Sequence, residues 1–372
     1  MPPSVLQTRQ KKLIETLQQN GPRAIAINPS PSLHYLTGLH FHFSERPVVV
    51  FFSAQNDPVI VLPELEAAKL QEVQYPLHSF TYGEDPTQWS QVFAQALQAA
   101  GLEKAQIGAE SRALRLLELR LLQEAAPEAT VLPADEVIAT LRMYKDESEI
   151  AAMQQAAQIA QEALQATLPA VKIGVTEKEI AAELSMQLLR HGSNPQLPFF
   201  PIVSGGPNSA NPHAAPSERK LQAGDLLVID WGANVDGYFS DITRTFAIGE
   251  VDTEFRRIAE IVLAANQAAH ATARPSVPAA AVDRAAREVI ASAGYGKYFT
   301  HRTGHGLGLE GHEEPYIRGD NQMPLEPGMS FTIEPGIYLT NRNGVRIEDD
   351  VVITTDGCQS LTDLPRALIT LA

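Results

Sequence analysis

The sequence contains a single cysteine, Cys358, among 372 residues, and this scarcity rules out an internal disulfide bond. So little cysteine is typical of proteins that fold in a reducing compartment. The N-terminal residues lack the apolar core of a signal peptide, and no apolar run approaches the roughly 20 residues that a membrane-spanning helix needs. We therefore expect a cytoplasmic protein with no membrane partner.

Basic residues are also in short supply. Lysine and arginine number 29 against 44 aspartates and glutamates, which gives a formal net charge of −15. Nucleic acids and anionic membranes attract basic surfaces, so neither is expected as a main partner. The hydrophobic content of 44% and the charged content of 20% are those of an ordinary globular protein, and the length favours two domains.

Strand-like and helical patterns alternate in the first part of the chain, which predicts a small α/β domain. Two strand patterns are followed by two helical ones, at residues 46–52, 58–62, 87–100 and 113–125. We predict that this domain spans residues 1–136, that a linker spans 137–148, and that a second domain spans 149–372.

The second domain is expected to begin with a long amphipathic helix, marked by apolar residues from Ile150 to Leu164. Thr176 and Glu179 have the spacing of a capping box at the start of the next helix, and Gly294 is expected to end a later one. Such helices would cover one side of a curved antiparallel sheet. The predicted fold class is therefore α+β.

Two carboxylates flank a predicted hairpin of this sheet. The run from Asp225 to Asp230 has a buried-strand pattern that ends in an acid, and the residues up to Gly237 form a turn sequence. The return strand begins at Asp241, so the hairpin places Asp230 and Asp241 nearly opposite each other. Alone, Asp241 could equally be a turn residue, but like charges at this distance repel unless a cation lies between them.

The same design recurs further along the chain. Glu334 ends a strand-like run, Asn343 and Gly344 give a strong hairpin signal, and Glu348 lies on the return strand. Arg346 shares a face with Glu348, where it could be a structural ion-pair partner or could orient a carboxylate; we favour the second role. Four buried carboxylates carry a high desolvation cost, which two divalent cations would offset.

Three of the ten histidines lie between residues 301 and 312. The glycine-rich surroundings of His305 allow a close approach of backbone and imidazole, so His305 is a candidate metal ligand through a neutral nitrogen. Taken singly, His213, His301 and His312 are more typical of loop or core residues. The clustering of His301 and His312 with His305 favours a functional role for that group.

These motifs give the chain a clear resemblance. The segments that carry it are 228–232, 240–245, 301–308, 333–338 and 345–350, in that order. The chain resembles the "pita-bread" metallopeptidases, specifically the Xaa-Pro dipeptidase (prolidase) and Xaa-Pro aminopeptidase (aminopeptidase P) branch. Residues 35–38 and 45–47 look like parts of the N-terminal domain of that branch. The resemblance implies an N-terminal creatinase-like α/β domain and a C-terminal pita-bread domain, in which helices cover a curved antiparallel sheet.

The resemblance also implies roles for individual residues. The implied ligands of two metal ions are Asp230, Asp241, His305, Glu334 and Glu348. Asp241 and Glu348 would bridge the two ions. His213 and His312 are the implied catalytic residues that hold the substrate and stabilise the transition state. Glu334 is our own candidate for moving the proton, as a third catalytic residue. The implied substrate-binding residues are His301, Tyr338 and Arg346, the last lying behind Glu348.

The function that follows is hydrolysis of the bond between an N-terminal residue and proline by a metal-bridging hydroxide. Two metal ions can lower the pKa of a bridging water and polarise the scissile carbonyl. Oxygen-rich ligation with one histidine favours Mn(II), with Co(II), Fe(II) or Zn(II) as alternatives. The expected substrate is a proline-containing di- or oligopeptide, and the expected assembly is a homodimer.

Several alternatives stay open at this point. Tyr316 stands where some prolidases carry an arginine that binds the carboxylate of a dipeptide, so dipeptidase and aminopeptidase activities are both compatible with the sequence. The histidines His40 and His42 could decorate a surface hairpin or, by resemblance, could reach the site of a partner subunit. A creatinase-like amidinohydrolase and a non-catalytic peptide- or protein-binding pita-bread module are rival functions, but neither needs the full set of ligands.

Overall fold

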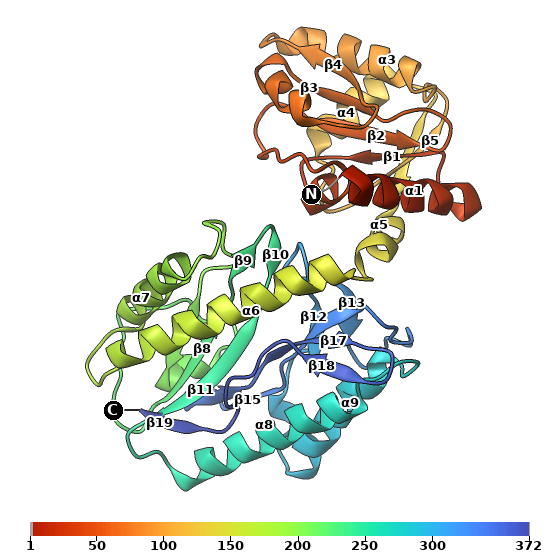
Figure 1. Cartoon of the computed structure of the whole chain (residues 1–372). Coiled ribbons are helices and arrows are strands. Elements are labelled where there is room, and N and C mark those ends of the chain that lie inside the picture. Colours follow the sequence, from red (N-terminus) through yellow and green to blue (C-terminus); the bar gives the residue numbers. More distant parts are fainter. Residues whose placement is uncertain (1–2, 372) are drawn as a thin grey trace. The chain divides into compact units, whose positions relative to one another are not determined.

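The computed structural model describes residues 3–371, and the chain divides into two compact units between Arg142 and Met143 (Figure 1). The N-terminal unit contains a six-stranded mixed sheet with the strand order β4-β3-β2-β1-β5-β6. Its strands are β1 (Ala24–Ile27), β2 (Val49–Ser53), β3 (Val59–Pro63), β4 (His78–Tyr82), β5 (Gln106–Ala109) and β6 (Thr130–Pro133). Its helices are α1 (Pro3–Asn20), α2 (Pro31–Thr37), α3 (Trp89–Ala99), α4 (Leu116–Ala125) and α5 (Asp135–Arg142), with the 3-10 helices η1 (Glu64–Glu72) and η2 (Pro86–Gln88).

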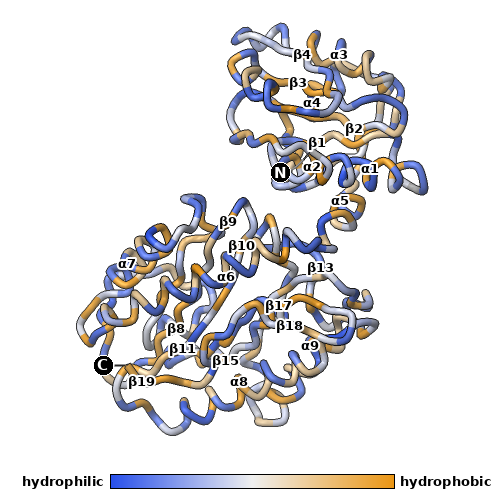
Figure 2. Tube along the Cα trace, viewed as in Figure 1, coloured by the Kyte–Doolittle hydropathy of each residue, from blue (hydrophilic) through white to orange (hydrophobic). Residues whose placement is uncertain are grey.

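The α/β character predicted for this unit is confirmed. The predicted strands correspond to β2 and β3, which are hydrophobic along almost their whole length (Figure 2) and fully buried. The predicted helices correspond to α3 and α4, although α4 begins three residues later than the sequence pattern suggested. The segment that carries His40 and His42 contains no strand, so the hairpin interpretation of that loop is wrong. The two imidazoles lie edge to face there, with ring centroids 5.2 Å apart.

The C-terminal unit holds thirteen strands and four α-helices among its described residues. The strands are β7 (Ile202–Gly205), β8 (Leu226–Trp231), β9 (Asn234–Val235), β10 (Tyr238–Phe239), β11 (Ile242–Ile248), β12 (Gly304–Gly306), β13 (Glu313–Ile317), β14 (Ser330–Ile333), β15 (Gly336–Tyr338), β16 (Gly344–Arg346), β17 (Asp349–Ile353), β18 (Cys358–Ser360) and β19 (Ile369–Leu371). The helices are α6 (Glu147–Thr167), α7 (Glu177–Arg190), α8 (Thr253–Thr272) and α9 (Ala279–Ser292), with the 3-10 helices η3 (Leu168–Ala170), η4 (Gly206–Ala210) and η5 (Gly296–Tyr298).

Two main sheets organise this unit, one with the order β19-β11-β8-β7 and the other with the order β13-β12-β14-β17-β18. An isolated antiparallel bridge between Thr243 and Glu348 joins them. Helices α6 and α7 pack on the first sheet through an apolar core that includes Trp231, while α8 and α9 pack on the second (Figure 1). The prediction of a curved, mostly antiparallel sheet covered by helices is therefore confirmed. The helices leave the other face of the sheets available for a functional site.

Local sequence signals account for the helix limits in this unit. Thr176 and Glu179 form the predicted capping box of α7, in which each side chain binds the backbone N–H of the other. Asp146 and Glu149 form a second capping box at the start of α6. Helix α9 ends at Ser292, and Gly294 follows with φ +89°, a left-handed conformation that glycine adopts without strain.

The register of the first acid-bearing hairpin differs from the prediction. Asp230 is paired with Thr243, whereas Asp241 lies just outside the ladder, between β10 and β11. The difference arises because the short β9–β10 ribbon is inserted between β8 and β11 and takes up the residues before Ile242. A shift of two residues keeps side chains on the same face of a strand, so Asp241 still converges with Asp230.

The second acid-bearing hairpin has the predicted register. The β14–β17 ladder pairs Ile333 with Asp349, and the β15–β16 ladder pairs Gly336 with Arg346. Glu334 and Glu348 therefore face each other in the short interval between the two ladders. Among residues 3–371, none of the helices combines the length and the apolar character that crossing a bilayer requires.

Candidate metal centre

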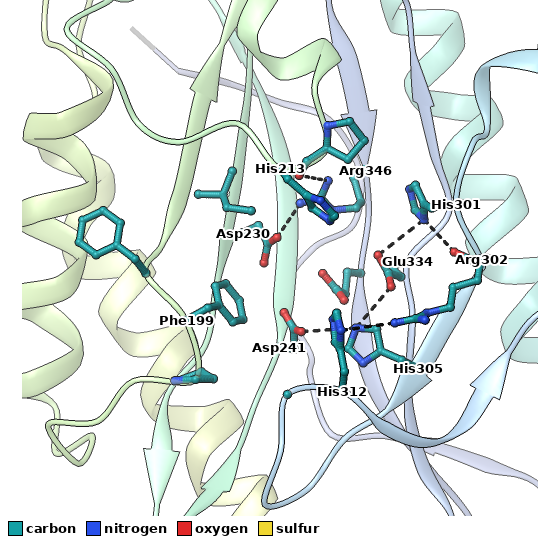
Figure 3. Close-up of a pocket in the computed structure, with 16 residues that line it drawn as sticks. Phe199, His213, Asp230, Asp241, His301, Arg302, His305, His312, Glu334 and Arg346 are labelled. Atoms are coloured by element: carbon teal, nitrogen blue, oxygen red, sulfur yellow. Dashed lines mark hydrogen bonds and ion pairs between the residues drawn. The ribbon is translucent and has the colours of Figure 1, made fainter. Parts of the chain in front are cut away.

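The five side chains predicted to bind metal line one pocket of about 840 Å³ in the C-terminal unit (Figure 3). Asp230 comes from β8, Asp241 from the β10–β11 junction and His305 from β12. Glu334 and Glu348 come from the interval between β14–β17 and β15–β16. Segments separated by more than a hundred residues in sequence therefore contribute to one site.

The tightest group within the pocket consists of Asp241, His305 and Glu348. Each offers one ligand atom, and these three atoms lie within 4.8 Å of one another. His305 Nε2 lies 3.8 Å from Asp241 Oδ2 and 3.5 Å from Glu334 Oε1. All three residues are buried, which means that bulk water does not screen their charges. One divalent cation could contact a carboxylate oxygen of each acid and the imidazole nitrogen together.

Glycines on both sides of His305 allow its backbone to pass close to its neighbours. A Cβ atom at Gly304 would lie 1.8 Å from Thr332 O, and one at Gly306 would lie 2.3 Å from Glu314 O. No side chain can be accommodated at either distance. The Gly-His-Gly sequence of β12 is therefore a packing requirement, and it fixes the position from which His305 reaches the acids.

The tautomer of His305 also suits metal binding. Its Nδ1 atom lies 3.2 Å from Gly306 O, and because a carbonyl oxygen can only accept, Nδ1 must carry the proton. The lone pair of Nε2 then faces the carboxylates. Burial, with the positive charge of a protonated His312 as a second cause, places the pKa of His305 well below its usual value. The imidazole is thus neutral and ready to act as a ligand.

The carboxylates of the centre resist ionisation in the absence of cations. Burial raises the pKa of Asp230. Burial, together with the negative charges of Glu348 and Asp230, raises the pKa of Asp241 well above its usual value. Burial and the charge of Glu334 do the same for the pKa of Glu348. The pKa of Glu334 itself rises to about 8, mainly through burial. Four acids with these properties are expected where cations normally supply the compensating charge.

One buried oxygen supports the same reading. Asp230 Oδ1 has no hydrogen-bond donor within reach among residues 3–371, although a buried carboxylate oxygen normally has one. Its sister atom Oδ2 accepts a 2.6 Å hydrogen bond from Arg346 Nη2. The orphaned oxygen points into a pocket lined by three other acids and an imidazole (Figure 3), which is a donor set that hard or borderline divalent cations prefer. The residues therefore fit a metal centre.

Arg346 is the hub of the polar network behind the centre. Its guanidinium donates to Asp230, to Thr243 Oγ1 at 3.1 Å and to the Tyr338 hydroxyl at 3.1 Å. Thr243 Oγ1 in turn donates to Glu348 Oε2 at 2.5 Å. Arg346 is therefore paired directly with Asp230 and reaches Glu348 only through Thr243.

A second-layer acid holds the backbone of a candidate ligand. The Asp241 N–H donates to Asp350 Oδ2 at 3.0 Å, and Asp350 is fully buried. Neither Thr243 nor Asp350 was identified from the sequence, because both lie in ordinary strand patterns. Their contacts to the ligands are made across more than a hundred residues and leave no local signal.

The outer residues surround the mouth of the pocket. His301 Nε2 lies 2.9 Å from the Tyr338 hydroxyl, so Tyr338 stands behind His301 and links it to Arg346. Burial lowers the pKa of His301 to about 4, with the charge of Arg346 as the next cause. The His312 ring lies 4.0 Å from that of His305, and His213 reaches the pocket from the exposed loop after η4 (Figure 3).

Two features of the pocket were not identified from the sequence. An apolar wall faces the acids and consists of Pro198, Phe199, Phe200 and Ile202. Phe200 is 65% exposed, which is unusual for so large an apolar side chain and is typical of a surface that binds a ligand. Arg302 lines the opposite side. The only sequence signal for this wall was the pair of phenylalanines in a proline-rich loop. No local pattern relates that loop to the pocket carboxylates, which come later in the chain.

Comparisons with known proteins agree with this architecture. The profile of metallopeptidase family M24 matches residues 151–355, and that of the creatinase/prolidase N-terminal domain matches residues 9–144. An Xaa-Pro dipeptidase of Lactobacillus delbrueckii subsp. lactis is 35% identical over 360 residues, covering 96% of this chain and 97% of the relative. A dipeptidase structure from Pyrococcus horikoshii OT3 superposes with a TM-score of 0.92 at 39% identity, covering 98% of this chain and 100% of that one. An X-Pro aminopeptidase structure from Thermotoga maritima superposes with a TM-score of 0.85 at 32% identity, covering 97% and 99%.

Proposed function

This chain belongs to metallopeptidase family M24, and from that membership we propose that it is an Xaa-Pro peptidase, which hydrolyses the bond between an N-terminal residue and proline. The predicted resemblance to the prolidase and aminopeptidase P branch is confirmed. The observation that carries the proposal is the convergence of four carboxylates and one neutral imidazole on a single pocket. Membership in a metallopeptidase family implies that divalent metal ions act at this site.

We propose that two ions bind here. Four ionised carboxylates carry four negative charges, which two dications balance. The proposed ligands are Asp230, Asp241, His305, Glu334 and Glu348, and their oxygen-rich chemistry favours Mn(II). When bound, such ions act as Lewis acids that lower the pKa of water and polarise the scissile carbonyl.

Glu334 is our candidate for proton transfer. Its side chain is 15% exposed, which makes it the most accessible of the three pocket acids that lie close to His305. A carboxylate beside a metal-bound water can accept a proton from it and give that proton up again. We propose that a Glu334 oxygen takes a proton from water and delivers it to the proline nitrogen, a leaving group that needs protonation because it is basic.

The outer histidines are proposed to bind the reacting carbonyl group. His213 and His312 are both exposed at the pocket mouth and can donate hydrogen bonds to an oxygen that gains negative charge. His301 is held by Tyr338 on one side and by Arg302 O on the other, which suits it to line a substrate pocket with a fixed orientation. Arg346 and Tyr338 are proposed to act by positioning Asp230 and His301.

The test of this proposal is loss and recovery of activity with metal. Protein stripped with a chelator should lose hydrolysis of Ala-Pro and regain it with Mn(II), while elemental analysis should find metal only in the loaded form. Asp241→Asn should abolish both activity and bound metal. Asp320→Asn is the matched control, because Asp320 is an exposed acid paired with Arg318 outside the pocket. Full activity of the stripped protein would contradict the proposal.

A homodimer is the assembly that we propose from the resemblance. Light scattering coupled to size-exclusion chromatography would measure the molar mass directly, and a value near 40.4 kDa for the active species would contradict a dimer. This measurement is independent of the metal experiment.

A further inference from the structure

Glu177 is a fully buried acid that does not line the metal pocket. It occupies the first turn of α7, where the N-terminus of the helix favours a negative charge. Its Oε1 atom accepts a 2.7 Å hydrogen bond from the Gly205 N–H, and its Oε2 atom accepts from the Ser217 N–H at 2.9 Å and from the Ser217 hydroxyl at 2.6 Å. Burying a carboxylate is costly unless donors surround it, and here the donors belong to one loop.

Glu177 joins the two ends of a loop that reaches the mouth of the pocket. Gly205 is the last residue of β7, and Ser217 lies beyond residues 206–216, so one carboxylate closes the loop at its base. From within the loop, the Asn208 side-chain amide donates to both carboxylate oxygens at 3.0 Å. An ionised carboxylate only accepts hydrogen bonds, whereas the amide of a glutamine would turn an NH2 group toward one of these donors. An acid is therefore the side chain that fits this position.

The same loop is also held from the side of the metal pocket. The Ser209 hydroxyl accepts a 2.8 Å hydrogen bond from the Gly344 N–H on β16. Arg346, on the same strand, donates from Nη1 to Pro212 O at 3.2 Å, and this guanidinium also holds a pocket carboxylate. His213 follows Pro212 directly in the chain. The backbone of His213 is therefore fixed on one side by the hub of the metal centre and at the base of the loop by the buried acid.

The position of the His213 imidazole depends on these backbone anchors, because the residue is exposed and reaches the pocket from its loop (Figure 3). A hydrogen bond to an oxygen that gains negative charge requires a donor within about 2.7–3.1 Å of that oxygen. A misplacement of about 1 Å can lower the rate about 100-fold. Release of the loop at its base would therefore weaken catalysis even though the metal ligands stay in place.

We propose that Glu177 is a positioning residue, which sets the backbone of the 206–216 loop so that His213 meets the carbonyl group of the substrate. This assignment rests on the proposed Xaa-Pro peptidase function and on the role of His213 in it. Glu177 lies behind the loop and acts on the reaction through His213. Its effect belongs to the transition state, in which the carbonyl oxygen gains charge, and not to metal binding.

The experiment is a double-mutant cycle of Glu177→Gln and His213→Ala, measured with Ala-Pro on the Mn(II)-loaded, full-length protein. Glu177→Gln keeps the shape of the side chain and should lower kcat about 10- to 100-fold with little change in KM, because the interaction that it weakens is made in the transition state. In the His213→Ala background, Glu177→Gln should lower kcat no further, because the imidazole that Glu177 positions is absent. Elemental analysis should find as much bound metal in Glu177→Gln as in the wild type.

Glu218→Gln is the matched control for this cycle. Glu218 directly follows Ser217, but its side chain is 77% exposed and pairs with a lysine of α7, so its substitution should leave kcat unaltered. Ser217→Ala and Asn208→Ala each remove a side-chain donor and keep the acid, so each should lower kcat less than Glu177→Gln does. Either of them completes the cycle with His213→Ala if Glu177→Gln does not fold.

Three results would overturn the assignment while leaving the peptidase function intact. They are an unchanged kcat in Glu177→Gln, an equal fall in kcat whether or not His213 is present, and a fall that lost metal alone explains. Failure of the wild-type protein to cleave any Xaa-Pro substrate with Mn(II) would instead overturn the proposed function itself.

Discussion

Metal binding to this protein should release protons, and the amount can be worked out from the environment of the carboxylates. The pKa of Glu334 is raised from 4.5 to about 8, and those of Asp241 and Glu348 lie well above their usual values. Near neutral pH the stripped protein therefore holds a proton on Glu334, whereas His305 holds no extra one because its pKa is lowered. Cations that bind the ionised carboxylates should displace at least about one proton per protein at pH 7.

The same shifts predict how the stability of the stripped protein depends on pH. A carboxyl group with a raised pKa binds its proton more tightly in the folded state, so its contribution to stability is present at low pH and is lost as the pH rises. For Glu334 alone, the change from 4.5 to about 8 corresponds to about 5 kcal/mol. The buried His301 and His305 have lowered pKa values and act in the opposite direction below about pH 6.5, so the free energy of unfolding of the stripped protein should fall between about pH 7 and pH 8. Metal at a thousandfold excess over its Kd should restore about 4 kcal/mol.

Calorimetric titration with Mn(II) in two buffers of different ionisation enthalpy would count the released protons, and urea unfolding with and without metal would measure the stability. Glu334→Gln removes one titrating group, so it should release fewer protons and should flatten the pH dependence of the stripped protein. Asp320→Asn, an exposed acid outside the pocket, should behave like the wild type. Uptake of protons on metal binding, or a stripped protein whose stability rises from about pH 7 to pH 8, would refute the electrostatic reasoning.

Two further predictions concern the scaffold of the centre. Asp349→Asn should lower the free energy of unfolding at pH 7 by about 3–5 kcal/mol, measured in urea, because it leaves buried Arg244 without its carboxylate partner. Burial opposes ionisation of Asp349, but Arg244 and Arg366 hold its pKa below the usual value. The contribution of Asp349 to the free energy of unfolding is therefore present above about pH 4 and should be lost as the pH falls further. A stability difference between variant and wild type that widens in acid would contradict this. Gly304→Ala should cost about 3 kcal/mol or more and lower the metal content, because its Cβ would lie 1.8 Å from a backbone oxygen. Gly357→Ala, where a Cβ meets nothing within 4 Å, is its control, and equal Tm values for the two variants would contradict the packing argument.

The sequence alone determined much of this protein, because several of its signals are local. The capping box of Thr176 and Glu179 depends on residues three apart, and the turn at Asn343 and Gly344 sets the register that places Glu334 opposite Glu348. The charge argument needed only the residue types, since buried carboxylates require compensation wherever they lie. Motif spacing then led to the family.

The tertiary structure decided what depends on contacts between distant segments. The β9–β10 ribbon shifted the first hairpin so that Thr243, and not Asp241, pairs with Asp230. Arg302 and Tyr316 lie on different segments, and only the fold stacks one on the other. No local propensity specifies such a contact, because it follows from how whole sheets and helices pack. In another strand register, the side chains that now meet would face solvent.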